Sequence, residues 1–304
     1  MRRFLLPLLT LAFTTSVVAA EDVPAPLANL LPDVPRGKVV EMPLWRSKIY
    51  PNTTRAWSIY VPAQYRPESP AALMVFADGQ EFLDRRGSWR VPVVLDQLIA
   101  EGAVPPVIAV MIAPGSAVSV GTSARPGAPT QRNVELEGLG DRGARFLLEE
   151  ILPEIEKQYR VSSDPEMRAL AGSGSGGVCA FTAAWERPDV FHKVLCLNGT
   201  FTNICGANGY PALIRKTERK PLRVLLDSLD NDVETVAGHS RLSILQMHAA
   251  LKYMGYDCRF EGGGNQAAVP ESASFPAALR WLWRQDHPAP RINTKGDLAG
   301  DLTL

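Results

Sequence analysis

The sequence predicts an α/β fold in one domain, with a mostly parallel central sheet covered by helices on both faces. Short apolar runs such as Val107–Ile112 and Leu222–Leu226 are continuous, which is typical of parallel strands buried on both faces. These runs alternate with longer segments of helical periodicity, and this alternation favours a parallel α/β sheet. The 304 residues, 46% hydrophobic and 21% charged, are enough for one large core.

The first twenty residues have the pattern of a secretory signal peptide. Arg2 and Arg3 give a basic start, residues 4–18 form an apolar run, and Val18-Ala19-Ala20 is a small-residue cleavage site. A run of about fifteen apolar residues is short for a membrane span. We therefore expect residues 1–20 to be removed, no membrane insertion after that cleavage, and a periplasmic or secreted mature chain.

The remainder of the chain divides into three parts. Residues 21–38 are rich in proline, residues 39–287 carry the predicted strands and helices, and residues 288–304 form a polar tail. The formal net charge is zero. Because no basic or acidic excess is present, neither a nucleic acid nor an anionic membrane surface is an expected partner.

The N-terminal half of the domain contains strands, a helix and one long loop. Strands are expected at Ala56–Val61, Ala72–Phe76 and Val107–Ile112, and a helix at Val93–Ala100. Residues 114–130 are rich in Pro, Gly, Ser and Thr and too long for a plain connection, which is typical of an active-site loop. Leu139–Tyr159 has helical periodicity, and Pro153 is expected to bend or split that helix.

The C-terminal half continues the alternation of strands and helices. Strands are expected at Val194–Leu197, Leu222–Leu226 and Cys258–Glu261, and helices at about Ser240–Met254 and Phe275–Arg284. A loop extends from the first of these strands through Tyr210, and a glycine-rich loop precedes the last helix.

The four cysteines do not form a zinc motif, because their spacings match no zinc pattern. Cys179 and Cys196 fall in a helix and a strand, where each is expected as a small core residue. An oxidising compartment would permit a disulfide. The sequence therefore leaves undecided whether Cys196 and Cys205 form a disulfide, and it leaves the state of Cys258 undecided as well.

The segment from Arg168 to Trp185 is the most informative part of the chain. Ala169–Ala171 predicts a strand and Val178–Trp185 a helix, and four glycines lie within the six residues between them. A strand, a glycine-rich turn and a helix are the surroundings of a G-x-S-x-G nucleophile elbow. In the frame Gly172-Ser173-Gly174-Ser175-Gly176, however, the nucleophile position holds Gly174.

A glycine at that position has a physical rationale. The nucleophile of an elbow occupies a strained backbone region that costs a non-glycine residue roughly 1–3 kcal/mol. Glycine adopts such regions without a Cβ clash. Glycine therefore relieves the strain and removes the attacking oxygen together.

The sequence resembles the putative-esterase family of α/β-hydrolases, the enterochelin-esterase-like proteins, from about Pro43 to Trp283. The similarity lies in the stretches Met74–Gln80, Gly87–Val94, Phe146–Glu154, Arg168–Gly172, Trp185–Asp189, Tyr210–Lys216 and Arg280–Trp283. The resemblance implies a single α/β-hydrolase domain. Family members are serine hydrolases of carboxylic esters, including siderophore, feruloyl and acetyl esters, and they need no cofactor.

The resemblance also maps the family's catalytic triad onto this chain. The nucleophile falls on Gly174, the acid best matches Asp232, and the histidine position falls on Gln266 or Ala267. The histidines of the chain lie elsewhere, at positions 192, 239, 248 and 287. Two of the three triad members are therefore missing. Since triad residues act as a unit, the loss of one leaves little function for the others.

Other residues remain as candidates for the site. A frame shifted by one residue would make Ser175 the nucleophile, but such a shift turns its side chain to the other face, and Ser is also favourable as a polar residue in the first turn of the helix. The family supplies an oxyanion-hole amide from the loop that contains Gly79 and Gln80. Arg132 and Glu135 match polar positions lining the family's cleft, or are solvated surface charges. Asp230 and Asp232 are too few carboxylates to indicate a metal site.

Two functions follow from these observations. The first is an exported, non-hydrolytic pseudoenzyme that binds a small ester or an acyl or aromatic ligand. The alternative is a weak or unconventional carboxylic-ester hydrolase that uses Ser175 with an unidentified base. Neither requires a cofactor or a metal.

Overall fold

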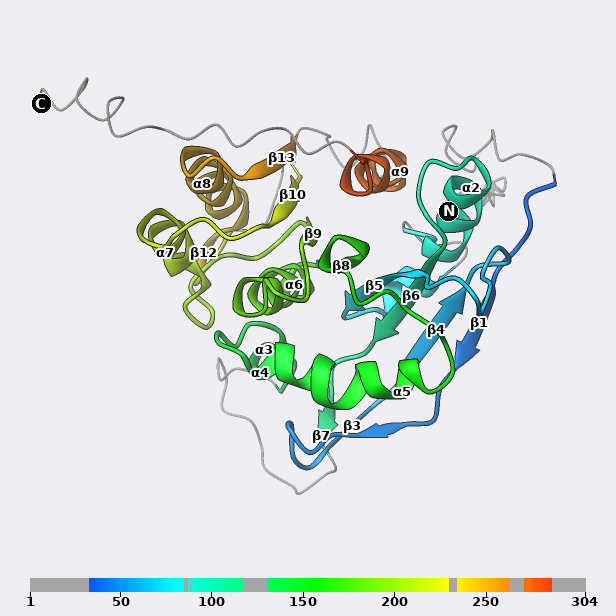
Figure 1. The fold of residues 1–304 in the computed structure, drawn as a ribbon. Helices are drawn as coiled ribbons and strands as arrows, with labels where there is room; N and C mark the ends of the chain where they lie inside the picture. The colour runs from blue at the N-terminus through cyan, green and yellow to red at the C-terminus, as the bar shows by residue number, and fades with distance from the viewer. Residues whose placement is uncertain are drawn as a thin grey trace, which may run out of the picture.

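A computed structural model describes residues 33–84, 87, 89–117, 131–229, 234–262 and 271–285. Its centre is an eight-stranded sheet with the order β1-β4-β6-β5-β8-β9-β10-β13 (Figure 1). In that order the strands are Lys38–Glu41, Trp57–Val61, Val107–Ile112, Ala72–Ala77, Arg168–Ser173, Lys193–Leu197, Arg223–Ser228 and Asp257–Gly262. The mostly parallel sheet expected from the apolar runs is confirmed.

The sheet changes direction near one edge. Neighbouring strands from β6 to β13 pair in parallel, whereas β4 runs antiparallel to both β6 and β1. The smaller strands are β2 (Trp45–Arg46), β3 (Thr53–Arg55) and β7 (Ser116–Ala117) in one sheet, and β11 (Glu234–Thr235) and β12 (Gly238–His239) in another. These additions extend the predicted architecture without altering it.

Helices cover both faces of the sheet (Figure 1). Each face has its own hydrophobic core. The helices are α1 Gln80–Leu83, α2 Val91–Ala100, α3 Gln131–Leu136, α4 Arg142–Arg145, α5 Leu152–Glu156, α6 Ser175–Glu186, α7 Tyr210–Lys216, α8 Ser240–Tyr253 and α9 Glu271–Leu282. Helices α2 and α9 pack on one face. Helices α4 to α8 pack on the other, where Phe181 and Trp185 of α6 fill the core.

Proline changes the long helix predicted over Leu139–Tyr159. The chain is helical from Arg142 to Glu156, but Phe146–Ile151 (η2) forms a π-helical segment between α4 and α5. Pro153 has no N–H to donate, so the regular ladder cannot continue unchanged through this point. A local π-bulge is one of the known ways in which a helix absorbs such a break.

The structure also settles two other points of the sequence analysis: the loop predicted to extend through Tyr210, and the state of the cysteines. Tyr210 begins α7 and donates a hydrogen bond from its hydroxyl to Thr182 Oγ1 (2.8 Å), so tertiary packing starts a helix where local sequence did not indicate one. All four cysteines are free thiols, and no Cys196–Cys205 bridge is formed. Cys196 is fully buried and donates to the carbonyl oxygen of Gly177 (3.2 Å).

A small ion-pair cluster connects the start of β9 to the 3-10 turn Pro165–Met167. The Glu166 carboxylate contacts Lys193 Nζ and His192 Nδ1, each at 2.7 Å. Burial alone would raise the pKa of Glu166, but the hydrogen bonds from Lys193 and His192 outweigh it and hold this pKa at about 2. Because Lys193 is itself buried, its charge depends on this carboxylate for compensation.

Replacing Glu166 by Gln should therefore destabilise the fold in a pH-dependent way. A carboxyl whose folded pKa is depressed stabilises the protein above its unfolded value near 4.5, and this contribution is lost as the pH falls toward 2. In urea melts, the free energy of unfolding of Glu166→Gln should be clearly lower than that of the parent at pH 7, and this difference should shrink between pH 4.5 and pH 2. The exposed pair of Glu154 with Lys157 provides a control, because Glu154→Gln should change stability little at any pH.

Candidate functional site

The turn between β8 and α6 has the geometry of a sharp strand-to-helix elbow. Gly174 connects the two elements with φ 55° and ψ −121°. Its N–H donates to the carbonyl of Leu197 in β9 (2.9 Å), and its own carbonyl accepts the N–H of Gly177 (3.1 Å). The turn is therefore fixed to the neighbouring strand and to the first turn of the helix.

The glycines around the turn serve different purposes. A Cβ at Gly172 would lie 2.2 Å from the carbonyl carbon of Gly176, and a Cβ at Gly176 would lie 2.6 Å from the carbonyl oxygen of Ala77. At Gly174 no atom lies within 4 Å of the Cβ position. Position 174 thus has room for a side chain, although its backbone conformation disfavours one. Both properties are expected of the nucleophile position of an elbow.

Ser175 is the first residue of α6, and its side chain is engaged rather than free. Its Oγ donates to Glu137 Oε1 at 2.5 Å and accepts a hydrogen bond from Arg132 Nη1 at 3.3 Å. Ser175 is only 6% exposed, and Glu137 is completely buried. The second carboxylate oxygen of Glu137 has no hydrogen-bond partner among the described residues.

Arg132 connects Ser175 to the loop after β5. Its Nε donates to Asp78 Oδ2 (2.8 Å), and its Nη2 forms an ion pair with the same oxygen. The Arg132 side chain is 42% exposed, so it forms the accessible side of the site. Asp78, Arg132, Ser175 and Glu137 therefore form one continuous chain of polar contacts over the start of α6.

The loop expected to supply an oxyanion-hole amide is Asp78-Gly79-Gln80. The N–H of Gly79 donates to the carbonyl of Ile112 (2.9 Å) and is thus used within the fold. A Cβ at Gly79 would lie 2.6 Å from the Met111 Cα, which explains the glycine. The N–H of Gln80, at the start of α1, has no acceptor within its own helix. Gln80 is therefore the better placed of the two for binding an oxygen.

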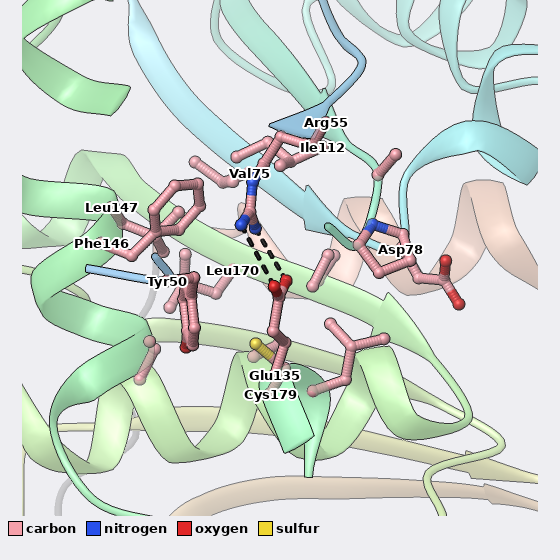
Figure 2. Close-up of a pocket in the computed structure, with 18 residues that line it drawn as sticks. Tyr50, Arg55, Val75, Asp78, Ile112, Glu135, Phe146, Leu147, Leu170 and Cys179 are labelled. Carbon is pink, nitrogen blue, oxygen red and sulfur yellow. Dashed lines mark hydrogen bonds and ion pairs between the residues drawn. The ribbon is translucent and has the colours of Figure 1, made fainter. Parts of the chain in front are cut away.

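Glu135 lies in the interior rather than on the surface. Its carboxylate pairs with both terminal nitrogens of Arg55 (2.8 and 3.2 Å) and accepts the N–H of Gly115 (2.9 Å). Figure 2 shows the two side chains pointing toward one another beside a cavity that they help to line. Both side chains are 3% exposed. Glu135 therefore holds Arg55 in place and is not a surface charge.

The triad positions mapped after the elbow lie outside the described residues. These are Asp232, Gln266 and Ala267, together with His287. None of the three described histidines hydrogen-bonds to Ser175. His192 pairs with Glu166, and His248 packs against Phe260.

Neither a metal site nor a membrane span is found in the described ranges. They contain no group of three or more His, Cys, Asp or Glu residues that could hold a metal ion. No helix within them has both the length and the apolar character needed to cross a membrane.

Glu137 is the site residue that sequence analysis missed. It follows α3 directly, two positions after Glu135, and no local pattern separates the two glutamates. The distinguishing feature is the contact with Ser175, which is 38 residues away along the chain. Only the fold reveals it.

Comparison with known proteins identifies relatives of this chain. A family model described as "Putative esterase" matches residues 49–244. The uncharacterized protein YbbA of Bacillus subtilis is 20% identical over 237 residues, which cover 75% of this chain and 92% of that protein.

Solved structures with the same fold include two esterases. The enterobactin esterase of Shigella flexneri, solved in the presence of 2,3-dihydroxy-N-benzoyl-glycine, is 19% identical with a TM-score of 0.62. The match covers 81% of this chain but only 59% of that enzyme. A ferulic acid esterase from Anaeromyces mucronatus, in complex with ferulic acid, is 18% identical with a TM-score of 0.65, covering 86% of this chain and 96% of that one.

The conformation of Gly174 leads to a stability prediction. Gly174→Ser should lower the free energy of unfolding by roughly 1–3 kcal/mol, because φ of 55° is costly for a residue with a Cβ. Gly209→Ala is a matched control, since Gly209 has φ of −77° and open space around its Cβ position. Urea or thermal melts should leave the control within about 0.5 kcal/mol of the parent. Equal stabilities of the two variants would contradict the strain argument.

Proposed function

The chain belongs to the Putative esterase family, and on this basis we propose that it is a non-hydrolytic member that binds a small ligand without cleaving it. One observation carries the proposal: the turn between β8 and α6 has elbow geometry, yet its central residue is Gly174. A serine hydrolase attacks its substrate through a side-chain oxygen at this point. Here that oxygen does not exist.

Among the described residues, no histidine serves as a base for the hydroxyl of Ser175. A hydroxyl nucleophile needs a base within about 2.6–3.2 Å that can accept its proton. The acceptor of the Ser175 Oγ–H is the carboxylate of Glu137, at 2.5 Å, and carboxylates are weak bases toward an alcohol. Ser175 is also buried, which limits its access to an ester carbonyl.

The charges around the elbow also oppose ester hydrolysis. Acyl transfer generates an oxyanion, which hydrolases stabilise with preorganised hydrogen-bond donors. Glu137 places a carboxylate beside the start of α6, and Asp78 places another beside the loop of Gln80. Arg132 contacts Asp78 and Ser175 and so compensates one of these charges. A carboxylate left uncompensated at this point would disfavour an oxyanion.

The proposed ligand is a small ester or an acyl or aromatic compound. One of the two esterase structures is a complex with ferulic acid, and the other was solved in the presence of a dihydroxybenzoyl-glycine, which supports a ligand of this chemistry. We further propose that the protein acts in the periplasm or outside the cell, on the signal-peptide pattern of residues 1–20.

A second candidate function is a weak ester hydrolase with Ser175 as the nucleophile. The observation that favours it is the 2.5 Å hydrogen bond from Ser175 Oγ to Glu137, because it supplies a proton acceptor that the sequence did not reveal. Arg132 Nη1, 3.3 Å from the same oxygen, would stabilise a developing alkoxide. The two functions differ in whether Ser175 reacts.

A serine-reactive probe distinguishes them. The purified protein should not be labelled by a fluorophosphonate, and its hydrolysis of activated aryl esters should stay near the uncatalysed rate. Ser175→Ala and Glu137→Gln serve as controls. Labelling that peptide mapping assigns to Ser175, and that both substitutions abolish, would establish the hydrolase instead.

Restoring the triad tests whether the rest of the scaffold is that of an esterase. Gly174→Ser alone should regain little activity, because the new hydroxyl has no histidine base. When Gly174→Ser is combined with Gln266→His or Ala267→His, the aryl-ester hydrolysis rate of the double variant should exceed the sum of the rates of its single variants, since triad groups act as a unit. Aryl-ester kinetics of the singles and doubles provide the measurement. Strong activity of Gly174→Ser alone would reveal an unrecognised base and contradict the mapping of the histidine position.

A further inference from the structure

The side of the elbow that faces solvent offers hydrogen-bond donors that the fold does not use. Arg132 donates from Nε and Nη2 to Asp78 Oδ2, and from Nη1 to the hydroxyl of Ser175. Each terminal nitrogen of a guanidinium carries a second N–H. Neither of these has a further acceptor among the described residues, and 42% of the side chain is exposed. Arg132 can therefore donate to a ligand oxygen without losing its contacts to the protein.

Free space lies next to these donors, at the point where a hydrolase would carry its nucleophile. A Cβ at Gly174 would have no atom within 4 Å. The next residue is Ser175, and its Oγ is 3.3 Å from Arg132 Nη1. A carbonyl group can therefore approach Gly174 without a clash and has Arg132 as a donor for its oxygen.

The charges of the elbow determine which carbonyl compound this space suits. Its chain of contacts joins two carboxylates, those of Asp78 and Glu137, to the one guanidinium of Arg132. The interior pair of Arg55 and Glu135 adds no net charge. The N-terminus of α6 contributes roughly half a positive charge, which is less than the one negative charge in excess. Among the described residues, the charges in contact at the elbow are therefore unfavourable for an anion.

Asp78 brings part of this negative charge to the surface. Its side chain is 21% exposed, and Figure 2 shows its carboxylate pointing away from the pair of Arg55 and Glu135. Glu137 is completely buried and acts from the interior. A ligand that reaches Arg132 from solvent therefore meets the carboxylate of Asp78 as well.

We propose that the elbow selects a neutral carbonyl compound, an intact ester or amide, over the corresponding free acid. Arg132 binds the carbonyl oxygen, and the carboxylates of Asp78 and Glu137 exclude a ligand carboxylate. This inference rests on the proposed function, because it takes the elbow as the ligand site, and it adds the class of ligand and the residues that determine specificity. A protein with this preference retains the uncleaved compound and rejects the product of its hydrolysis.

Two probes of nearly equal shape isolate the effect of charge. Benzamide is neutral and benzoate is ionised at neutral pH, and both carry the same ring and a planar group with an oxygen acceptor. Each is titrated into isotope-labelled protein at low ionic strength, since salt screens charges near the surface. The NMR signals of the backbone amides of Gly174 and Ser175 and of the Arg132 Nε–H report binding at the elbow.

Four variants assign the effect to residues. Asp78→Asn and Glu137→Gln each remove one carboxylate at nearly constant size, and asparagine tolerates the φ of 58° at position 78. Arg132→Gln removes the donor. Asp189→Asn is the matched control, because Asp189 also pairs with an arginine, Arg187 (2.7 Å), but past the opposite end of α6.

Benzamide should bind saturably, with a dissociation constant in the roughly millimolar range. Benzoate should bind at least about tenfold more weakly, because like charges in contact near a protein surface repel by more than this factor requires. Asp78→Asn and Glu137→Gln should each reduce the ratio of the two constants about threefold or more, whereas Asp189→Asn should leave it unchanged. Arg132→Gln should weaken benzamide binding about tenfold, the loss of one hydrogen bond.

The results that contradict this inference differ from those that contradict the proposed function. Benzoate binding as tight as that of benzamide, or a ratio that neither carboxylate variant changes, would overturn the selection and leave the elbow as a ligand site. Undiminished benzamide binding in Arg132→Gln would overturn its role as the donor. If neither probe shifts the elbow signals, the inference and the proposed ligand binding both fail. Fluorophosphonate labelling of Ser175 in the same samples would contradict only the non-hydrolytic function.

Discussion

The close approach of β8 and α6 determines where every group of the site lies. Gly172 and Gly176 touch so closely that a Cβ on Gly172 would overlap the backbone, and Gly176 is equally close to the end of β5. This contact brings the start of α6 against the loop of Asp78, so that Arg132 reaches both Asp78 and Ser175. The same contact leaves Gly174 at the outer point of the turn, where space remains but the backbone favours glycine.

The two polar regions next to this turn, the Arg55–Glu135 pair and the group around Ser175, differ in how their charges are balanced. In the interior, Arg55 and Glu135 neutralise one another and are almost completely buried. At the elbow, Asp78 and Glu137 face a single arginine, and that arginine is partly open to solvent. A hydrolytic site needs positive potential where negative charge develops. The two carboxylates and one arginine around the start of α6 support the proposal of a non-hydrolytic site on the family scaffold.

Sequence alone predicted most of the fold, because its strands are continuous apolar runs. Val107–Ile112 was predicted with the bounds that β6 has, and the elbow segment was placed between the correct strand and helix. The π-helical turn and the start of α7 at Tyr210 depend on packing, which local patterns do not record. The role of Glu135 as the partner of Arg55 is similarly non-local, since 80 residues separate the two.

The composition of the two edge strands of the sheet has a consequence for association between copies of this chain. An edge strand presents unpaired backbone groups that can template pairing with another molecule. The strand order ends at β1 and β13, strands of four and six residues. Strand β1 begins with Lys38 and ends with Glu41, and Arg259 and Glu261 form an ion pair on β13. Charged side chains on an edge strand disfavour strand addition, so these residues reduce the tendency of the sheet to pair edge to edge.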